Sequence, residues 1–564
     1  MKPSDYPPPV EPGEFAVAPT SDEENRLEVG VMFVGAGPAN LAGAIRLMQL
    51  LEQSPEITES LGEMPVVVLE KGRAPGAHLL SGACVNPMAF RKLFPDLKDP
   101  DFPFFDRVDS ESVYYLTSGG KFRLPTPPTM RNHGNFVASL SQVGRWLGEK
   151  AEEAGVMILP ETAATHVLVE DGRVRGVRTG DKGLDRDGKP LDNHEPGPDI
   201  LGPITVIGEG GIGHLTEATL ERFGVKRPSP QIYALGVKEV WEVARPLDEV
   251  IHSMGWPLRA AAKYREFGGS FCYPMGKDKV SIGLVVGMDY ADADLSVHDL
   301  LQEMKGHPLF KGILEGGKRL EKGWGAKTIP EGGYHSLPEK FSVPGAMFVG
   351  DAVGLVNVPT LKGIHYAMWS GILAAESIYA RLKEAAGNLD SVSKSALSSY
   401  DDSIRSSFIH KELYEVRNMR HAFKHGFFVG GAMAGLMTLT KGAFPGGKIE
   451  VGTDSSHSMF NSKRTYPKPD GSSTFDKLDS VHASGNKSRD NQPNHIRLKT
   501  DVPEAMALAW IKMCPAQVYE WHEEEGKKTL MINGPNCIHC GAITAKGGRL
   551  TPPEGGSGPE YSLM

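Results

Sequence analysis

Three cysteines near the C-terminus have the residue type and part of the spacing of a metal centre. Cys514, Cys537 and Cys540 are three of only five cysteines in the chain, and the last two form a C-x-x-C pair. Thiolates gathered in this way are soft ligands for iron–sulfur clusters or zinc. An iron–sulfur cluster normally takes four thiolates, but the residue three positions after Cys540 is Ile543. The C-terminal segment is therefore expected to add a metal or redox site whose fourth cysteine is missing.

A glycine-rich turn near the other end has the pattern of a dinucleotide site. An apolar run at 27–34 predicts a strand, and Gly35, Gly37 and Pro38 follow it before a run with helical spacing. Gly35 allows a tight turn, Gly37 allows the backbone to approach a pyrophosphate, and the helix N-terminus supplies a positive dipole. Asn40 replaces the third glycine of the motif and is expected to loosen the packing of helix on strand. The turn predicts a nucleotide cofactor; the alternative is an ordinary buried strand–helix turn.

Two further apolar strands end in residues that suit the same site. One ends at Glu70, the acidic residue expected to hold a ribose hydroxyl, and Lys71 follows it. The other ends at Gly208, with Gly210 two positions later. Because the carboxyl ends of parallel strands meet at one edge of a sheet, all four residues are assigned to the nucleotide site.

A fourth strand indicates which nucleotide is bound. It delivers Gly350 and Asp351, and a helix is expected to begin at Gly363 and Ile364. A carboxylate at this place can hold the ribityl hydroxyls of FAD, and a helix N-terminus facing the flavin stabilises its reduced, anionic form. Asp351 alone could instead cap a helix. The repeated strand-to-glycine junctions favour FAD over NAD.

Composition limits the classes of function. The chain has 564 residues, which suggests two to four domains, and its net charge of -9 argues against nucleic acid as a partner. Five cysteines give no disulfide framework, as expected in a reducing compartment. The first 26 residues are rich in proline and acidic side chains, so they predict a disordered lead rather than a secretory signal or an arginine-rich transit peptide.

One apolar segment suggests contact with a membrane. Residues 427–439 would rise only about 20 Å as a helix, which is too short to cross a hydrocarbon core of about 30 Å. Basic residues precede the segment, the arrangement that anionic headgroups attract: Lys411, Arg417, Arg420 and Lys424. The segment therefore predicts either a helix that dips into a membrane or a helix buried in the core, and the residues themselves do not decide.

The remaining pattern places a second domain inside the first. The runs 267–273 and 280–286 read as strands of a β-rich domain able to cover the flavin, and they interrupt the nucleotide-binding segments. After Gly446 the chain becomes polar and loop-rich until it reaches the cysteines.

With these features placed, the chain resembles the electron transfer flavoprotein–ubiquinone oxidoreductase family from about residue 27 to its end. The strings that carry the resemblance include GAHLLSGAC at 76–84 and NCIHC at 536–540. The others are at 133–135, 268–271, 283–287, 314–319, 357–359, 362–363, 370–377, 466–471, 491–493, 514–516, 518–520 and 553–556.

The resemblance implies an α/β fold with three interleaved parts. A Rossmann-like FAD-binding domain is expected at 27–108, 134–225 and 330–400. A β-rich domain that binds quinone and contacts the membrane is expected at 109–133, 226–329 and 401–445. A ferredoxin-like iron–sulfur domain with a 4Fe-4S cluster is expected at 446–564.

The resemblance also implies a function and further site residues. A member of this family accepts electrons from reduced electron transfer flavoprotein and passes them through its cofactors to ubiquinone. Gly268 and Gly269 match the turn that holds the quinone headgroup, and Ser81 and Gly82 match residues at the FAD. No catalytic acid–base side chain is expected, because the flavin carries the chemistry. The implied location is monotopic, on the cytoplasmic face of a bacterial inner membrane, with 122–125 and 427–439 in contact with it.

The missing ligand leaves alternatives open. In the family pattern the fourth cysteine stands where this chain has Ile543. A four-iron cluster with a non-cysteine ligand, a three-iron cluster, a zinc site that uses His539 or His522, and a site without metal all remain. The rival function is an FAD-dependent quinone or isoprenoid reductase that takes electrons from another donor and keeps the C-terminal segment as a structural or zinc-binding module.

Overall fold

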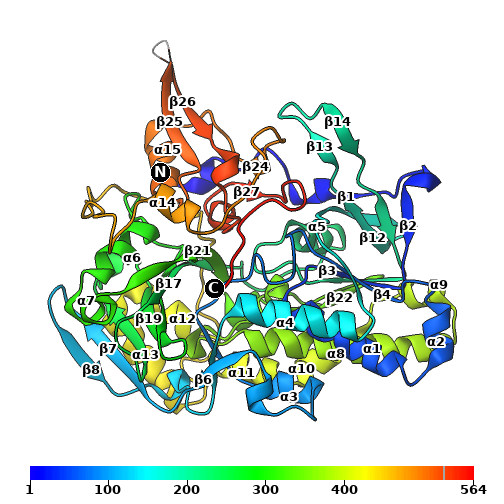
Figure 1. The fold of residues 1–564 in the computed structure, drawn as a ribbon, viewed down its shortest axis with the longest axis horizontal. Helices are drawn as coiled ribbons and strands as arrows, with labels where there is room; N and C mark the ends of the chain where they lie inside the picture. The colour runs from blue at the N-terminus through cyan, green and yellow to red at the C-terminus, as the bar shows by residue number, and fades with distance from the viewer. Residues whose placement is uncertain (525–526) are drawn as a thin grey trace.

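The chain forms a nucleotide-binding sheet with helices, a larger and mostly antiparallel sheet beside it, and a C-terminal unit that packs above both (Figure 1). The computed structural model describes residues 1–524 and 527–564. The predicted α/β architecture with an interleaved β-rich part is confirmed.

The nucleotide-binding sheet has six strands in the order β10-β4-β3-β16-β23-β22. All neighbours pair in parallel except the edge strand β22. The four central strands are short and fully buried, as expected for a parallel sheet covered on both faces. The bounds are β10 (Met157–Leu159), β4 (Val66–Leu69), β3 (Val31–Val34), β16 (Ile204–Ile207), β23 (Ala346–Phe348) and β22 (Ser342–Val343).

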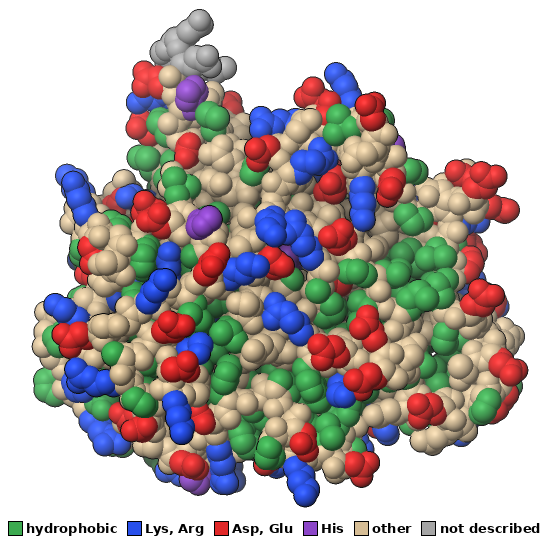
Figure 2. Space-filling model, in the orientation of Figure 1, with side chains coloured by type: hydrophobic (Ala, Val, Ile, Leu, Met, Phe, Trp, Pro, Cys, Tyr) green, Lys and Arg blue, Asp and Glu red, His purple; other side chains and the backbone are tan. Residues whose placement is uncertain are grey.

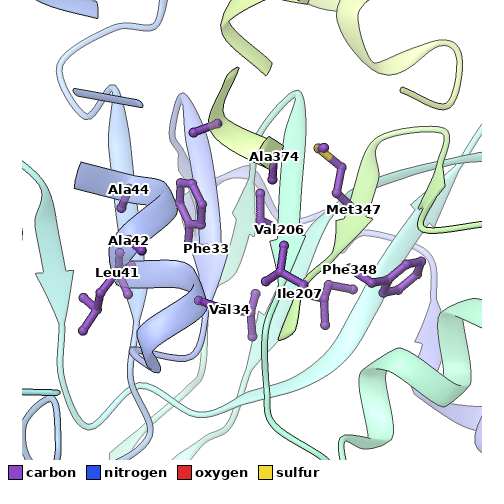
Figure 3. Close-up of a cluster of buried hydrophobic side chains, with 14 of the residues drawn as sticks. Phe33, Val34, Leu41, Ala42, Ala44, Val206, Ile207, Met347, Phe348 and Ala374 are labelled. Carbon is purple, nitrogen blue, oxygen red and sulfur yellow. The ribbon is translucent and has the colours of Figure 1, made fainter. Parts of the chain in front are cut away.

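Three helices build the layer next to this sheet. α1 (Pro38–Leu51) packs against both α4 (Leu140–Glu153) and α8 (Ile364–Ala385). Figure 3 shows side chains of β3, β16 and β23 beside alanines of α1 and α8. Small residues at these positions allow the helices to lie close to the strands, which holds the N-terminal ends of α1 and α8 in place.

The N-terminal residues are ordered here, which differs from the predicted disordered lead. β1 (Ala16–Val17) pairs in parallel with β11 (Ala164–Glu170) in a five-stranded sheet. Phe15 is buried, and its ring lies 5.1 Å from that of His214. Composition did not predict this order, because the segment is held by β11 and His214, which lie more than a hundred residues later in the sequence. The other strands of the sheet, in the order β1-β11-β12-β15-β2, are β12 (Arg173–Thr179), β15 (Asp199–Leu201) and β2 (Arg26–Glu28).

The second large sheet has seven strands in the order β21-β17-β20-β19-β18-β7-β8. The two strands expected from the sequence correspond to β19 (Gly268–Pro274) and β20 (Lys279–Gly287). β7 and β8 form a hairpin from a much earlier segment, so the nucleotide-binding part is interrupted more than once. The remaining bounds are β21 (Lys318–Pro330), β17 (Tyr233–Glu242), β18 (Val250–Gly255), β7 (Glu111–Leu116) and β8 (Lys121–Leu124).

Smaller elements complete these two parts. The helices are α2 (Pro55–Ser60), α3 (Met88–Leu93), α5 (His214–Arg222), α6 (Val297–Lys305), α7 (Pro308–Leu314), α9 (Leu389–Ser393), α10 (Ser398–Ser406), α11 (Phe408–Glu415), α12 (Met419–Ala422) and α13 (Phe427–Leu439). The strands are β5 (Ala83–Val85), β6 (Phe104–Arg107), β9 (Phe136–Ala138), β13 (Lys182–Leu184) and β14 (Pro190–Glu195). In the part of the chain that the structure describes, none of the helices has the length and apolarity needed to cross a bilayer.

The C-terminal unit shares a hydrophobic core with the seven-stranded sheet. Its last residues reach back to the nucleotide-binding part, where the hydroxyl of Ser139 donates to the carbonyl of Met564 at 3.1 Å. The unit is thus held on two sides. Its elements are α14 (Lys477–His482), β24 (Ile496–Arg497), α15 (Glu504–Met513), β25 (Tyr519–Glu524), β26 (Lys527–Ile532), α16 (Ala542–Ala545) and β27 (Arg549–Leu550).

Candidate functional site

The carboxyl ends of β3, β4 and β16 meet at one edge and form the turn predicted to bind a nucleotide. Gly35 has a φ of 98°, which favours glycine, and its amide donates to the carbonyl of Leu69 at 2.8 Å. Gly37 is the N-cap of α1, no side chain caps this helix, and Pro38 is its first residue. The free amides of the first turn can therefore receive an anion such as a pyrophosphate.

Asn40 tightens this turn, contrary to the expectation that it would loosen it. Its side chain is fully buried, and its Nδ2 donates to the carbonyls of Val34 and Gly35, each at 2.8 Å. The neighbouring strand makes room for it, because a Cβ atom at Gly208 would lie 2.6 Å from that nitrogen. The close approach expected of the third glycine of the motif is thus provided by Gly208 instead.

Glu70 is buried beside the same turn. Its carboxylate accepts from the amides of Ala36 at 2.9 Å and Gly72 at 2.7 Å. Burial raises the pKa of Glu70, while these amides and the charge of Lys71 act to lower it. Burial lowers the pKa of Lys71 in turn. Each carboxylate oxygen has a further lone pair, so Glu70 can hold the turn and still accept from a ribose hydroxyl.

Asp351 and the start of α8 lie next to each other at the end of β23. A Cβ atom at Gly363 would lie 3.9 Å from Oδ1 of Asp351. Burial raises the pKa of Asp351 to about 6, and Lys327 acts to lower it. Among the described residues no hydrogen bond to this carboxylate is found, so it does not cap a helix. Gly363 is the N-cap of α8 without a side-chain cap, which leaves the amides after Ile364 available.

The other predicted flavin residues occupy two places. Ser81 and Gly82 lie where the nucleotide-binding part meets the seven-stranded sheet, and a Cβ atom at Gly82 would lie 2.5 Å from the ring of Phe271. Gly210 lies beyond β16 with a φ of 85° and open space around it. The structure therefore brings Ser81 and Gly82 to the interface of the two parts and leaves Gly210 at the open side of the nucleotide edge.

Gly268 and Gly269 begin β19, where neighbouring strands approach closely. A Cβ atom at Gly268 would overlap the carbonyl of Val285, and one at Gly269 would lie 2.6 Å from the carbonyl of Ser253. The sheet itself thus explains why both residues are glycine. Their role at a quinone stays a proposal.

The three C-terminal cysteines line one small cavity. Cys514 follows α15, and Cys537 and Cys540 flank the loop that leads into α16. Ile543 lines the same cavity and is 4% exposed, so the position of the missing fourth cysteine holds a buried apolar side chain. The rest of the lining is Met513, Pro515, Ala516, Val518, Tyr519, Ile538, Gly541, Ala542 and Leu550.

This donor set fits a cluster bound by three thiolates better than a zinc ion. Burial raises the pKa of the Cys540 thiol to about 12 and that of Cys537 further, and a metal that binds thiolates removes this cost. Neither His539 nor His522 lines the cavity. His539 and His495 do lie with Cys537 in a group whose ligand atoms are within 4.8 Å of one another, but neither histidine lines the cavity that Cys514 and Cys540 share with Cys537.

β21 joins the cysteine loop to the flavin edge, a link that the sequence analysis missed. The amide and hydroxyl of Thr328 both donate to the carbonyl of Cys540 at 2.9 Å. Nζ of the adjacent Lys327 donates to the carbonyl of His539 at 3.1 Å, and its charge acts on Asp351. No local signal identifies these residues, because they lie on a strand far from both motifs in the sequence.

Two family models match parts of the chain. The family model of the ubiquinone-binding domain of electron transfer flavoprotein–ubiquinone oxidoreductase matches residues 233–329, and the model of its 4Fe-4S domain matches 471–562. Among solved structures, a geranylgeranyl bacteriochlorophyll reductase-like protein from Thermoplasma acidophilum has a TM-score of 0.54 at 16% identity, covering 74% of this chain and 92% of that one. At this identity the likeness shows the fold alone.

Curated relatives match over nearly the whole chain. The mitochondrial electron transfer flavoprotein-ubiquinone oxidoreductase of Arabidopsis thaliana is 39% identical, covering 95% of this chain and 85% of the relative. The human protein is 38% identical over 95% of this chain and 89% of its own length. A probable bacterial member from Acinetobacter baylyi is 36% identical over 96% of this chain and 99% of its own length. The chain therefore belongs to the electron transfer flavoprotein–ubiquinone oxidoreductase family.

Proposed function

We propose that this chain takes electrons from reduced electron transfer flavoprotein and delivers them to ubiquinone at a membrane surface. The observation that carries the proposal is the joining of two sites by one strand. β21 holds the cysteine loop through Thr328 and presents Lys327 toward Asp351. β21 therefore contacts the cysteine loop and lies beside the flavin edge, and it keeps the two sites close together, as electron transfer between them requires.

Different residues of the chain bind FAD, the iron–sulfur cluster and the quinone, and apolar side chains shield the cluster from water. The turn at Gly35 and Gly37 receives the pyrophosphate of FAD, and Asp351 accepts hydrogen bonds from its ribityl hydroxyls. Bound FAD supplies the exchange between single electrons and the electron pair that a quinone accepts. Cys514, Cys537 and Cys540 hold an iron–sulfur cluster in a cavity that apolar side chains shield from water. Gly268 and Gly269 receive the quinone headgroup.

Membrane contact is supported by the exposure of α13. Only Gly430 and Met437 of this helix are buried, so α13 is not a core helix. Its large exposed apolar side chains lie near the β7–β8 hairpin, since the ring of Tyr115 on β7 is 6.0 Å from that of Phe428. The exposed apolar residues of this surface are Phe122, Phe428, Val429, Leu436, Leu439 and Phe444.

The basic approach to α13 is smaller than the sequence predicts. Arg420 is buried and pairs with Asp289 and Glu331, each at 2.7 Å, and Arg417 is buried as well. The exposed charge comes from Lys411, while Lys424 is half-buried. The proposed monotopic contact, on the cytoplasmic face of a bacterial inner membrane, therefore rests mainly on apolar burial.

The test is electron transfer with the purified protein kept free of oxygen. Reduced electron transfer flavoprotein and a short-chain ubiquinone are added, and quinol is measured together with the absorption and EPR spectra. We expect quinol formation that depends on the flavoprotein donor, with signals of both flavin and cluster. Two findings together would favour the rival reductase. Quinone would be reduced only with another electron donor, and the protein would contain stoichiometric zinc in place of iron and sulfide.

A further inference from the structure

Lys238 is a buried lysine that forms no ion pair within the part of the chain that the structure describes. It lies in the middle of β17, and its side chain is 1% exposed. Its Nζ donates to the carbonyl of Ser81 at 3.0 Å. This is its one hydrogen bond to the described residues, and none of their carboxylates forms an ion pair with it. Lys305, which is equally buried, has the carboxylate of Glu239 at 2.7 Å.

The sheet keeps a slot open for this side chain. In the register of the strands, Lys238 stands between Gly283 on β20 and Gly325 on β21. A Cβ atom at Gly283 would overlap the ring of Phe271, and one at Gly325 would lie 2.7 Å from the ring of Tyr561. The rings of Phe271 and Tyr561 thus fill the space above the two glycines that flank Lys238, and a larger residue at either glycine would displace a ring.

The ammonium group of Lys238 has fewer hydrogen-bond partners than it has donors. An ammonium group has three N–H donors, and the carbonyl of Ser81 accepts one of them. Burial of a charge without a partner is strongly unfavourable. Burial accordingly lowers the pKa of Lys238 to about 7. A lysine held there by a dedicated slot points to a ligand that brings the missing negative charge.

We propose that Lys238 is the counter-charge for the ring system of bound FAD in its reduced, anionic form. The location favours flavin over quinone, because the ammonium reaches across to Ser81 on the nucleotide-binding side. The N-terminus of α8 supplies a second, partial positive charge beside Asp351. The proposal rests on the FAD site of the proposed function and is independent of the electron donor and of the quinone.

Reductive titration of the holoenzyme tests the proposal. In Lys238→Met the preference for reduced over oxidised FAD is expected to fall at least tenfold, which makes the two-electron midpoint potential about 30 mV more negative. The oxidised holoenzyme should unfold at the same or a higher temperature, because an unpaired buried charge has been removed. Dithionite and a reference dye suffice, so a failure of the proposed donor or quinone would not affect the result.

Two further variants keep the outcome clear. Lys238→Gln retains a hydrogen-bond donor for the carbonyl of Ser81 but removes the charge, and we expect the same shift of the midpoint potential. This variant also provides the test if Lys238→Met does not fold. Lys305→Met removes a buried lysine at the end of α6 that pairs with Glu239 on β17, and it should lower the unfolding temperature and leave the potential unchanged. Unchanged potentials in both Lys238 variants would overturn the proposal. So would a raised KM for quinone at an unchanged potential, which would place the charge at the quinone.

Discussion

At the scale of single residues, Asp351 is expected to contribute directly to FAD affinity. Its carboxylate stands beside the start of α8 and accepts no hydrogen bond from the described residues. Loss of a charged acceptor in Asp351→Ala should weaken FAD binding by about 1.5–3 kcal/mol. Fluorescence titration of the flavin-free protein measures this. Asp187→Ala, on the exposed turn between β13 and β14, is the control. Equal affinity in both variants would remove Asp351 from the site.

The same carboxylate predicts a pH dependence of stability before FAD binds. The pKa of Asp351 is raised to about 6 from an ordinary value of 3.8. A raised folded pKa stabilises the fold below pH 4, and this contribution is lost as pH rises through 6. In flavin-free protein, Asp351→Asn should therefore gain stability relative to wild type between pH 4 and pH 8. Urea unfolding at both pH values measures the difference; a pH-independent difference would contradict the assignment.

Ile543 is expected to limit how firmly a cluster is held in the cysteine cavity. A cluster bound by Cys514, Cys537 and Cys540 alone leaves one corner without a thiolate, and the apolar side chain of Ile543 shares that cavity. Ile543→Cys is expected to raise the iron content of protein purified in air and to weaken any three-iron EPR signal. Ile543→Val is the matched control, because it adds no ligand. Equal iron content in the two variants would show that the loop does not bring position 543 to the vacant corner.

At the scale of elements, α13 is expected to bind membranes through one face. Leu436 is 48% exposed and Leu439 82% exposed, whereas Met437 is 1% exposed and belongs to the core of this segment. Aspartate at both leucines should release the protein from anionic vesicles while FAD stays bound, because two charges would enter the acyl boundary. Leu508→Asp on α15, at a residue 38% exposed, is the control. Retained vesicle binding of the double variant in a flotation assay would refute membrane contact by α13.

At the scale of the whole molecule, the two redox sites should be separable. Cys537→Ser is expected to slow reduction by electron transfer flavoprotein at least tenfold and to leave quinone reduction by a chemically reduced flavin nearly unchanged. Stopped-flow absorption follows both reactions. Cys272→Ala removes a buried thiol that does not line the cavity and serves as the control. If Cys537→Ser reacts with the donor at the wild-type rate, the C-terminal unit is structural and electrons reach the flavin by another route.

The sequence by itself determined the family, the α/β class and the identity of the local motifs. The turn at Gly35 and the Gly350-Asp351 junction are short segments whose conformation depends on adjacent residues, so pattern and spacing were sufficient to find them. The three cysteines and the absence of a fourth were equally visible. Two strands of the quinone-binding sheet were located from their apolar runs alone.

The tertiary structure decided everything that depends on partners distant in the chain. The N-terminal residues take their structure from the pairing of β1 with β11. Asn40, expected to loosen the turn, instead holds it through hydrogen bonds. Arg420, expected in an exposed basic patch, is buried in an ion pair. The tertiary structure also showed that Met437 is buried and that Lys238 forms no ion pair with the described residues. Burial and charge pairing are properties of packed surfaces, and a surface is assembled from strands and helices hundreds of residues apart. Local pattern therefore identifies which residues can do chemistry, but only the fold sets the environment in which they do it.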